Sequence, residues 1–370
     1  MTILFAVNSG HKRFFQKIKK HSKCYVSIVY SKNLFLFSFK SLLFLNQVDF
    51  SKAISLKVKD FLAKHDNTII PIKLLKFQYT CLALYNYMRY FPSITPRYSK
   101  IMLWNGMTFR QAIALEIAKI HNIKPIYIEN GFLPNRIVID TKGVNFHNSV
   151  PRDITFYQNY SHHKMLPTHL IPRKVKNPKK FSHSLQKELP EKYIFVPFQV
   201  DYDTQIMLFS PWITNMRELF TLLEEIAQKV NLNFVFKEHP SSKKDYPDLH
   251  KKIIKSSNLY FANNHSTQEL IQKSDAVLTI NSSVGIESLL FQKKVLVLGE
   301  AFYKIEGITI GINSKEELLN TLKILDKVQI DFHIVENFLK YLYFDYLIEG
   351  NFKEYNPRQI QRIEEKLACL

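Results

Sequence analysis

The chain has 370 residues, of which 46% are hydrophobic and 22% are charged, an ordinary composition for a folded soluble protein of two domains. Its three cysteines, Cys24, Cys81 and Cys369, are scattered and show no CxxC spacing, which argues against a disulfide framework and a zinc site. A reducing cytoplasm is therefore the expected compartment.

The excess positive charge is confined to the first half of the chain. Residues 1–190 contain 30 Lys and Arg against 8 Asp and Glu, whereas residues 191–370 contain 21 against 24. A one-sided field of this kind attracts a polyanion, either a nucleic acid or the anionic face of the inner membrane. A lysine-rich genome would be a plainer cause, but it would not spare the second half.

The chain begins with strand-like and helical segments in alternation. Residues 2–7 predict a strand, residues 12–21 a helix with its apolar residues on one face, and residues 24–30 a second strand. The first apolar run is too short for a secretory signal, and the basic residues follow it instead of preceding it.

The apolar stretch NLFLFSFKSLLFL, residues 33–45, comes nearest to a membrane span. It falls short of the roughly 20 apolar residues that a span needs, and Lys40 interrupts it. We expect it to form a buried strand or helix. The alternative is that it belongs to an aromatic, basic surface that faces anionic lipid.

Two further strands are predicted over 100–106 and 124–131, each running into Asn-Gly, with a helix over 108–122 between them. The stretch 170–192 has three prolines, many lysines and no apolar periodicity, which is typical of a linker. After the linker the alternation resumes. The expected strands are 192–199, 233–240, 276–283 and 294–299, and the expected helices are 216–230, 266–274 and 284–292.

This alternation on both sides of a linker predicts an α/β protein with two Rossmann-like parallel-sheet domains facing across a cleft. That is the GT-B arrangement of many nucleotide-sugar glycosyltransferases. We expect a basic N-terminal domain (1–185, the acceptor or membrane side), a nucleotide-sugar-binding domain (186–330) and a C-terminal helical segment (331–370) that packs back on the first domain. The absence of a P-loop and of GxGxxG argues against an NTPase or a nicotinamide enzyme.

The strongest local signal is TINSSVGIESLL, residues 279–290. Here a strand ends, Ser282 and Ser283 can donate to a phosphate, and Gly285 permits close approach. The free N–H groups of the following helix attract an anion, and Glu287 is placed one turn in to accept from ribose hydroxyls. Without a ligand the same pattern is a helix capped by a serine.

A second phosphate-type site follows another strand, at KEHP. Lys237 and His239 at a strand end can counter the charge of a phosphate or protonate a departing one. A solvated surface position is commoner for a lone histidine, but a second anion site in the same domain favours ligand contact. Gln199, at another strand end of this domain, is expected to line the site.

Carboxylates in both domains suit glycosyl transfer. The stretch QVDYDTQI supplies Asp201 and Asp203 in the second domain, and IENGF supplies Glu129 in the first. One carboxylate from each domain would act as acid/base and as nucleophile or stabiliser of an oxocarbenium-like centre. The plainer alternative for each is a solvated helix cap or an ion-pair partner.

Four blocks together resemble the capsular polysaccharide Kdo (3-deoxy-manno-octulosonate) transferases of Gram-negative bacteria. They are IENGFLPNRIVIDTKGVNFHNSVPRD (128–153), VPFQVDYDTQI (196–206), KEHP (237–240) and TINSSVGIESLLFQKKVLVLGEAFYKIEGIT (279–309). The blocks follow the family's order and fall in both domains. In size, in its single pair of domains and in its basic first half, the chain is similar to the enzyme that starts the Kdo linker on a lysophospholipid.

The resemblance implies a CMP-β-Kdo donor, used as a substrate without a further cofactor, and a β-linked product formed with retention. It implies Asp203 as the nucleophile, with Asp201 as the alternative, and Glu129 as acid/base or as a residue that positions the acceptor. Lys237 and His239 would hold the CMP phosphate. The other implied contacts are Ser282, Ser283 and Glu287 with the nucleotide, and Gly10 and His11 near the sugar.

One departure from the family pattern concerns the acceptor. Relatives carry Arg-Pro after GFL, whereas this chain has Pro134 and Asn135 there, and Arg136 is displaced. No metal is implied, because the sequence shows no ligand cluster and because Lys, His and a helix terminus can supply the positive charge instead.

The favoured function is a Kdo transferase of capsule assembly that is cytoplasmic and peripheral on the inner membrane. Its expected partners are CMP-Kdo, an anionic lipid or glycolipid acceptor, and capsule assembly proteins. The nearest alternatives are another CMP-sugar transferase, because the more distantly related bacterial sialyltransferases share the His-Pro dipeptide, and a capsule glycosyltransferase that acts on a different acceptor. A nucleic-acid-binding protein would explain the basic half, but no such motif is present and no nucleic acid is expected. A scaffold subunit of the capsule machinery is the remaining alternative.

Overall fold

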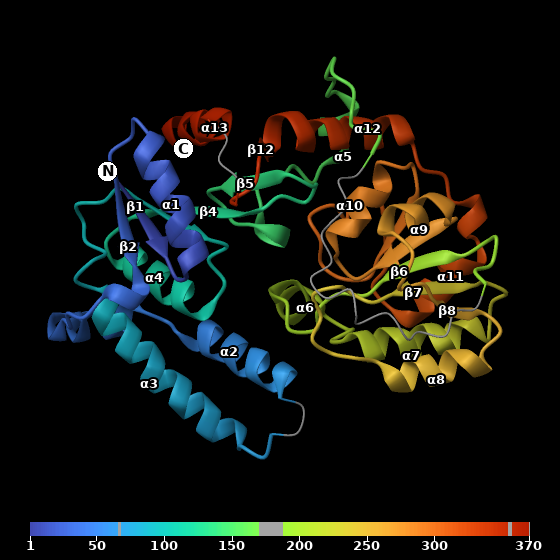
Figure 1. The fold of residues 1–370 in the computed structure, drawn as a ribbon, viewed down its shortest axis with the longest axis horizontal. Coiled ribbons are helices and arrows are strands. Elements are labelled where there is room, and N and C mark those ends of the chain that lie inside the picture. Colours follow the sequence, from blue (N-terminus) through green and yellow to red (C-terminus); the bar gives the residue numbers. More distant parts are fainter. Residues whose placement is uncertain (66–67, 170–187, 354–356, 370) are drawn as a thin grey trace. The chain divides into compact units, whose positions relative to one another are not determined.

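The computed structural model describes residues 1–65, 68–169, 188–353 and 357–369, and the chain divides into two units (Figure 1). The first unit comprises 1–131, 135–149 and 346–370, and the second comprises 132–134 and 150–345. The boundary at residue 150 corrects the predicted one at 185/186. The predicted linker lies mostly outside the described residues.

The first unit is built on a mixed sheet. Its strands are β1 (Thr2–Ala6), β2 (Val26–Tyr30), β3 (Lys100–Trp104), β4 (Lys124–Asn130), β5 (Arg136–Asp140) and β12 (Ile348–Glu349). They lie in the order β12-β5-β4-β3-β1-β2, with β2, β1, β3 and β4 parallel. The two strands at the other edge, β5 and β12, pair antiparallel. The predicted α/β class is therefore confirmed, with an antiparallel extension that the sequence did not predict.

Helices cover both faces of this sheet. They are α1 (Ser9–His21), α2 (Ser51–Lys64), α3 (Ile72–Tyr90), α4 (Phe109–Ile120) and α13 (Pro357–Cys369). The apolar residues of α1 and α13 pack together on one face of the sheet, and those of α2, α3 and α4 pack on the other. Thus 346–370, which supplies β12 and α13, belongs to the first unit through a shared core, and the return begins at 346 rather than at the predicted 331.

The second unit is built on a parallel sheet. Its strands are β6 (Ile194–Pro197), β7 (Phe234–Lys237), β8 (Leu259–Phe261), β9 (Ala276–Thr279), β10 (Lys294–Val297) and β11 (Ile310–Gly311). Their order is β11-β10-β9-β6-β7-β8, and each neighbouring pair is parallel. This is the strand order of a Rossmann sheet, so the predicted Rossmann-like domain is confirmed.

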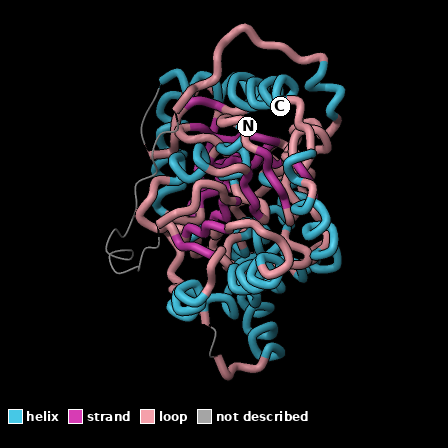
Figure 2. Tube along the Cα trace, turned by 90° about the vertical axis from the view of Figure 1, so that its right-hand side faces the viewer, coloured by secondary structure: helices cyan, strands magenta, loops and turns pink. Residues whose placement is uncertain are grey.

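Helices again cover both faces, and Figure 2 shows strands running between helical layers. The helices are α5 (Ile154–Gln158), α6 (Thr204–Phe209), α7 (Met216–Ala227), α8 (Pro247–Lys255), α9 (Thr267–Lys273), α10 (Ser283–Leu289), α11 (Lys315–Lys323) and α12 (Phe332–Lys340). One core cluster joins the sheet to α7, α8 and α11, and another joins it to α9 and α10.

Aromatic packing explains why the second unit begins at residue 150 and not near the predicted residue 186. Tyr157 of α5 is buried, and its ring lies edge-on to Phe338 of α12 at a centroid distance of 5.1 Å. The Asn337 side chain also donates to the Tyr157 carbonyl oxygen at 3.1 Å. The segment around α5 is therefore held in the second unit by a helix almost 180 residues later, which local sequence patterns do not reveal.

The apolar stretch 33–45 is not buried, so that expectation was wrong. It ends in a 3₁₀ helix, Phe39–Gln47, and most of its large apolar side chains are exposed. Of the helices that the structure describes, none is both long enough and apolar enough to cross a bilayer.

Candidate functional site

The second unit carries several predicted site residues at a topological switch point. From β6 the chain moves outward through β7 to β8, and then it returns to β9 and moves the other way to β11. The helices α7 and α10, which follow β6 and β9, pack on opposite faces of the sheet. In sheets of this kind ligands bind beyond the carboxyl ends of the two central strands. Residues 198–203 and 280–283 follow those two ends.

An amide pair joins the two loops at this switch point. Gln199 is buried, and its Nε2 donates to Asn281 Oδ1 at 2.9 Å. Its Oε1 accepts from the Asn281 backbone N–H at 3.1 Å, and Asn281 Nδ2 donates to the carbonyl oxygens of Gln205 and Phe209 at 3.0 Å. Both ends of the Gln199 amide are thus engaged within the fold, which gives this side chain a positioning role.

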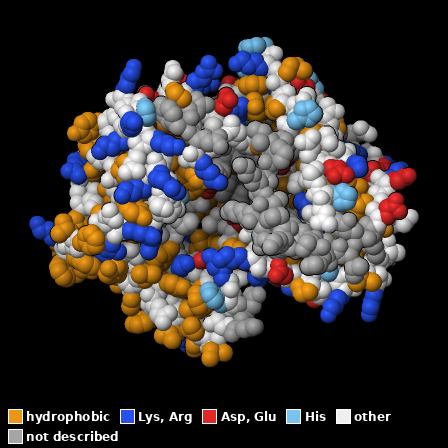
Figure 3. Space-filling model, viewed as in Figure 1, with side chains coloured by type: hydrophobic (Ala, Val, Ile, Leu, Met, Phe, Trp, Pro, Cys, Tyr) orange, Lys and Arg blue, Asp and Glu red, His pale blue; other side chains and the backbone are white. Residues whose placement is uncertain are grey.

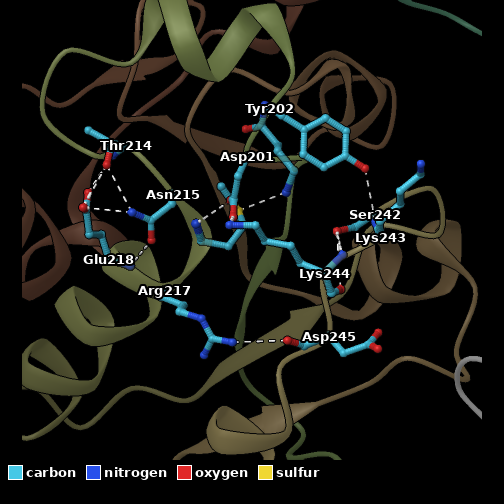
Figure 4. Close-up of polar contacts among 12 residues, drawn as sticks. Asp201, Tyr202, Thr214, Asn215, Arg217, Glu218, Ser242, Lys243, Lys244 and Asp245 are labelled. Carbon is cyan, nitrogen blue, oxygen red and sulfur yellow. Dashed lines mark hydrogen bonds and ion pairs between the residues drawn. The ribbon is translucent and has the colours of Figure 1, made fainter. Parts of the chain in front are cut away.

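The two aspartates after β6 lie in different surroundings. Asp201 is buried, its Oδ1 accepts from the Met216 N–H at 2.9 Å, and its Oδ2 is 3.5 Å from Lys244 Nζ (Figure 4). Asp203 is exposed and caps α6, where its Oδ1 accepts from the Gln205 N–H at 2.9 Å. Among the described residues Asp203 Oδ2 has no hydrogen-bond partner. Desolvation raises the pKa of the Asp203 carboxyl, although its hydrogen bonds act in the opposite direction.

The loops that follow β6 and β7 are tied to each other. The Lys243 N–H donates to the Tyr202 hydroxyl at 3.2 Å, beside the contact of Asp201 with Lys244 (Figure 4). Arg217 of α7 donates to the Asp245 carbonyl oxygen at 3.2 Å and pairs with Asp248. The β7 loop is therefore held by polar contacts against the β6 loop and against α7.

In the KEHP block the side chains of Lys237 and Glu238 point into the protein, whereas His239 is only half-buried. Lys237 Nζ donates to the carbonyl oxygens of Asn263 and His265 at 2.7 Å, and burial lowers its pKa to about 8. His239 is half-buried, and its Nδ1 accepts from the Ser241 N–H at 3.1 Å. This contact assigns the proton of the neutral ring to Nε2, which makes Nε2–H the donor of the imidazole.

Between these two residues lies the buried Glu238. Its Oε1 accepts from His250 Nε2 at 2.7 Å and from Asn263 Nδ2 at 3.0 Å. The loop after β8 is thus fixed from two adjacent positions of KEHP, and both Lys237 and Glu238 contribute to its position.

The serine block forms a capped helix start. Ser282 caps α10, and its hydroxyl accepts from the Val284 N–H at 3.2 Å. The close approach expected at Gly285 is made by Tyr303, whose hydroxyl donates to the Ser282 carbonyl oxygen at 2.5 Å. A Cβ at position 285 would lie 2.7 Å from that hydroxyl oxygen. Ser283 is half-buried and Glu287, one turn into α10, is buried.

Asp203, His239 and Ser282 follow the carboxyl ends of β6, β7 and β9, which are neighbours in the order β9-β6-β7. Because the strands are parallel, their carboxyl ends lie on one edge of the sheet. His239 and Ser282 are two strand spacings apart, about 10 Å between strand axes. The sheet therefore brings to one edge three residues that are widely separated in the sequence.

The first unit has its own switch point, between β1 and β3. There the His11 ring stacks on the Trp104 indole at a centroid distance of 4.8 Å. Trp104 Nε1 donates to Glu129 Oε1 at 2.8 Å. Gly10 lies beside His11 in the first turn of α1, and Asn8 caps this helix. His11 and Glu129, predicted from distant motifs, are thus connected through Trp104.

The environment of His11 defines its protonation state. Asn8 Nδ2 is 3.0 Å from His11 Nε2, so Nε2 accepts and Nδ1 carries the proton of the neutral ring. Nδ1 is buried and has no hydrogen-bond partner among the described residues. Burial lowers the pKa of His11 to about 4, which keeps the ring neutral at pH 7.

The atypical residues after GFL form the β4–β5 turn. Asn135 has a positive φ of 54°, and the Gly131 N–H donates to the Arg136 carbonyl oxygen. Arg136 begins β5, and its Nη1 is 3.5 Å from Glu349 Oε2 of β12. The displaced arginine is therefore paired within the sheet edge of the first unit.

Sequence reasoning missed Trp104 and Asn8. Trp104 is the last residue of β3, and Asn8 follows β1 and directly precedes α1, so the strand-end rule that selected their neighbours would have included both. Among the described residues no group of three or more His, Cys, Asp or Glu side chains is arranged to hold a metal ion.

Comparison with known proteins identifies related sequences. The family model described as "Capsule polysaccharide biosynthesis protein" matches residues 99–182 and 164–353. The chain is 34% identical over 261 residues to Protein FixF of Sinorhizobium fredii, covering 69% of this chain and 61% of FixF. It is 25% identical over 252 residues to the capsule polysaccharide export protein KpsS of Escherichia coli, covering 52% of this chain and 64% of KpsS. The matches thus span less than two thirds of each of these two relatives.

Among solved structures, the chain is similar to Thermosulfurimonas dismutans KpsC, which is described as a beta Kdo 2,7 transferase. The TM-score is 0.50 at 14% sequence identity, and the alignment covers 100% of this chain and 98% of that one. This likeness extends over both units and concerns the fold.

Proposed function

Because the chain belongs to the capsule polysaccharide biosynthesis protein family, we propose that it is a retaining glycosyltransferase that moves Kdo from CMP-β-Kdo to a lipid or Kdo-linker acceptor. The observation that carries the proposal is the Rossmann strand order of the second unit, with Asp203, His239 and Ser282 at one edge of its sheet. The family blocks in the sequence and the activity described for KpsC support Kdo as the sugar.

The second unit is proposed to hold the donor. His239 Nε2–H donates to the CMP phosphate, and the backbone N–H groups around Ser282 and Ser283 add further donors. Lys237 adds positive charge near the proposed phosphate position, and its Nζ also holds the loop after β8. Gln199 and Asn281 hold the loops after β6 and β9 in position, and Glu287 is the proposed ribose contact.

Asp203 is proposed as the nucleophile in preference to Asp201. Both oxygens of Asp201 contact protein groups, whereas Asp203 is exposed and its Oδ2 is available. Asp203 Oδ2 can therefore approach the anomeric carbon without giving up a hydrogen bond to a described residue. Asp203 attacks the anomeric carbon, and the bonding electrons leave with the CMP phosphate, whose charge His239 meets.

The first unit is proposed to serve the acceptor. Glu129 is proposed as the acid/base or as a residue that positions the acceptor. Once the acceptor hydroxyl has lost its proton it displaces Asp203 from the sugar, so that two inversions give retention. The Trp104 indole holds the Glu129 carboxylate, and the His11 ring stacks on the same indole and helps to orient it. An acceptor on a membrane lipid would bring the protein to the cytoplasmic face of the inner membrane.

The test is a donor comparison with the full chain. Purified protein is incubated with CMP-Kdo or CMP-sialic acid and with a lysophospholipid or a Kdo-bearing glycolipid, and CMP release and the lipid product are measured. We expect CMP release and a β-linked product with CMP-Kdo only. Release with CMP-sialic acid alone would refute the donor assignment and favour the sialyltransferase alternative.

Two aspartate variants separate catalysis from folding. Asp203→Asn keeps the cap of α6, because an asparagine oxygen accepts the same bond, and we expect transfer to fall by about a hundredfold or more with no loss of stability. Asp201→Asn breaks a buried ion pair and is expected to lower the free energy of unfolding by about 1–3 kcal/mol. If Asp203→Asn fully restored capsule to a strain that lacks the gene, a scaffold function would replace the proposal.

A further inference from the structure

Helix α3 exposes an apolar face in addition to the face that it buries. Leu75, Ala83 and Tyr87 face the core of the first unit. The exposed large apolar residues of the helix are Ile72, Leu74, Phe77, Leu82 and Tyr85. Leu74, Phe77, Leu82 and Tyr85 recur at helical spacing and form one stripe opposite the buried face. In a helix that is covered on one side only, a second apolar stripe is costly to expose to water and indicates a contact.

The stretch 33–45 continues this stripe. Its exposed apolar residues are Phe35, Leu36, Phe37, Phe39, Leu42 and Leu43. The Phe37 ring lies edge-on to Tyr85 of α3 at 5.4 Å, and Arg89 Nε donates to the Leu34 carbonyl oxygen at 2.9 Å. Figure 3 shows hydrophobic side chains gathered over this part of the first unit, with lysine and arginine side chains nearby. The two segments therefore form one surface, which we name the α3 apolar surface.

Within the two segments of this surface the charge is of one sign. Residues 1–48 and 67–115 contain no Asp or Glu. The lysines within its two segments are Lys40, Lys73 and Lys76, and these three and the adjacent Lys32 are all exposed. A second copy of the chain would bring two such basic segments face to face, which disfavours self-association. Exposed leucines and phenylalanines flanked by lysines match a bilayer with anionic headgroups instead.

We propose that the α3 apolar surface docks on an anionic lipid bilayer, with its Phe and Leu side chains at the headgroup–acyl boundary and its lysines at the phosphates. This docking rests on the proposed function, in which the acceptor is a lipid. The α3 apolar surface is the part of the fold that would contact the membrane. It is tested without a donor sugar, so failure of docking and failure of Kdo transfer are separate results.

The experiment is vesicle flotation of the full chain with phosphatidylcholine vesicles, with and without one quarter phosphatidylglycerol. The patch variant combines Phe35→Ser, Leu43→Ser and Phe77→Ser, whose side chains are 81%, 78% and 66% exposed. The matched control combines Met165→Ser, Ile254→Ser and Ile324→Ser in the second unit, which are 82%, 56% and 51% exposed. Circular dichroism verifies that both variants are folded.

We expect the wild type to bind anionic vesicles at least about tenfold more tightly than neutral ones, the patch variant to lose about tenfold or more, and the control to bind as the wild type does. Lys40→Glu with Lys76→Glu should weaken binding to anionic vesicles only. A patch variant that binds like the wild type, or a wild type that ignores anionic vesicles, overturns the proposal. A concentration-dependent dimer that the patch variant abolishes, without vesicle binding, would assign the surface to self-association instead.

Discussion

At the scale of single residues, neighbouring positions with the same side chain have different partners. Asp201 is buried against Lys244 and the start of α7, whereas Asp203 is exposed and caps α6 with one oxygen. The carboxylate that remains open to a ligand is the one proposed to react. In the same way Lys237 donates to two carbonyl oxygens, while His239 accepts a backbone N–H at its Nδ1.

The buried His11 predicts a pH dependence of stability. Its pKa is about 4 when folded against an ordinary 6.5, so between these values the unfolded chain binds a proton that the folded chain does not. The stabilisation is complete above pH 6.5 and is lost as the pH falls toward 4. We expect the wild type to lose on the order of 2 kcal/mol more unfolding free energy between pH 7 and 4.5 than His11→Phe, measured by urea titration.

The phenylalanine keeps an aromatic ring beside Trp104 and removes the titration. Parallel pH profiles for the wild type and His11→Phe would contradict the assignment. A wild type that becomes more stable as the pH falls would contradict it as well.

At the scale of elements, α10 shows how packing selects a glycine. Tyr303 is buried, and its hydroxyl is fixed by the Ser282 carbonyl oxygen, so the ring cannot move away from Gly285. The glycine therefore leaves room for the Tyr303 ring to pack against the first turn of α10. The sequence indicated the close approach but not the side chain that makes it.

Gly285→Ala is expected to lower the free energy of unfolding by about 1–3 kcal/mol, because the new methyl group would lie 2.7 Å from the Tyr303 hydroxyl oxygen. Adding Tyr303→Phe removes the nearest atom and should restore part of the loss. Gly10→Ala in α1 is the control, since its Cβ would lie no closer than 3.2 Å to another side chain, that of Asn8. Thermal unfolding measures the stability of Gly285→Ala, of its combination with Tyr303→Phe, and of Gly10→Ala. A Gly285→Ala protein as stable as the wild type would show that the Tyr303 ring can move aside.

At the scale of the whole molecule, the chain leaves the first unit and returns to it. Ile360, Ile363 and Leu367 of α13 are buried in the same cluster as Phe14, on α1. The two tryptophans of the chain report on different units, since Trp104 lies in the first and Trp212 in the second. The stability of each unit can therefore be followed by its own fluorophore.

Ile363→Ala should destabilise the first unit by about 2–4 kcal/mol, because it leaves a cavity beside α1 and the sheet. In a Trp212→Phe background, Trp104 fluorescence should show unfolding at a lower urea concentration. In a Trp104→Phe background, the Trp212 transition should be unchanged. Ile226→Ala in α7 is the mirror control and should shift only Trp212, whereas equal shifts of both probes would indicate that the units unfold as one.

The sequence by itself determined the α/β class, the predicted strands and helices, and the strand ends where polar residues gather. These features follow from local periodicity and from helix caps, which act over a few residues. The resemblance to the Kdo transferases likewise rested on short blocks read directly from the chain.

Only the tertiary structure decided which polar residues are engaged and which stay open, as for Asp201 and Asp203. It also decided that 150–169 packs with the second unit, that 346–370 packs with the first, and that 33–45 remains on the surface. The physical reason is that burial and hydrogen-bond partners depend on residues far away in the chain, such as Lys244 for Asp201 and Phe338 for Tyr157. Local patterns contain no information about such distant partners.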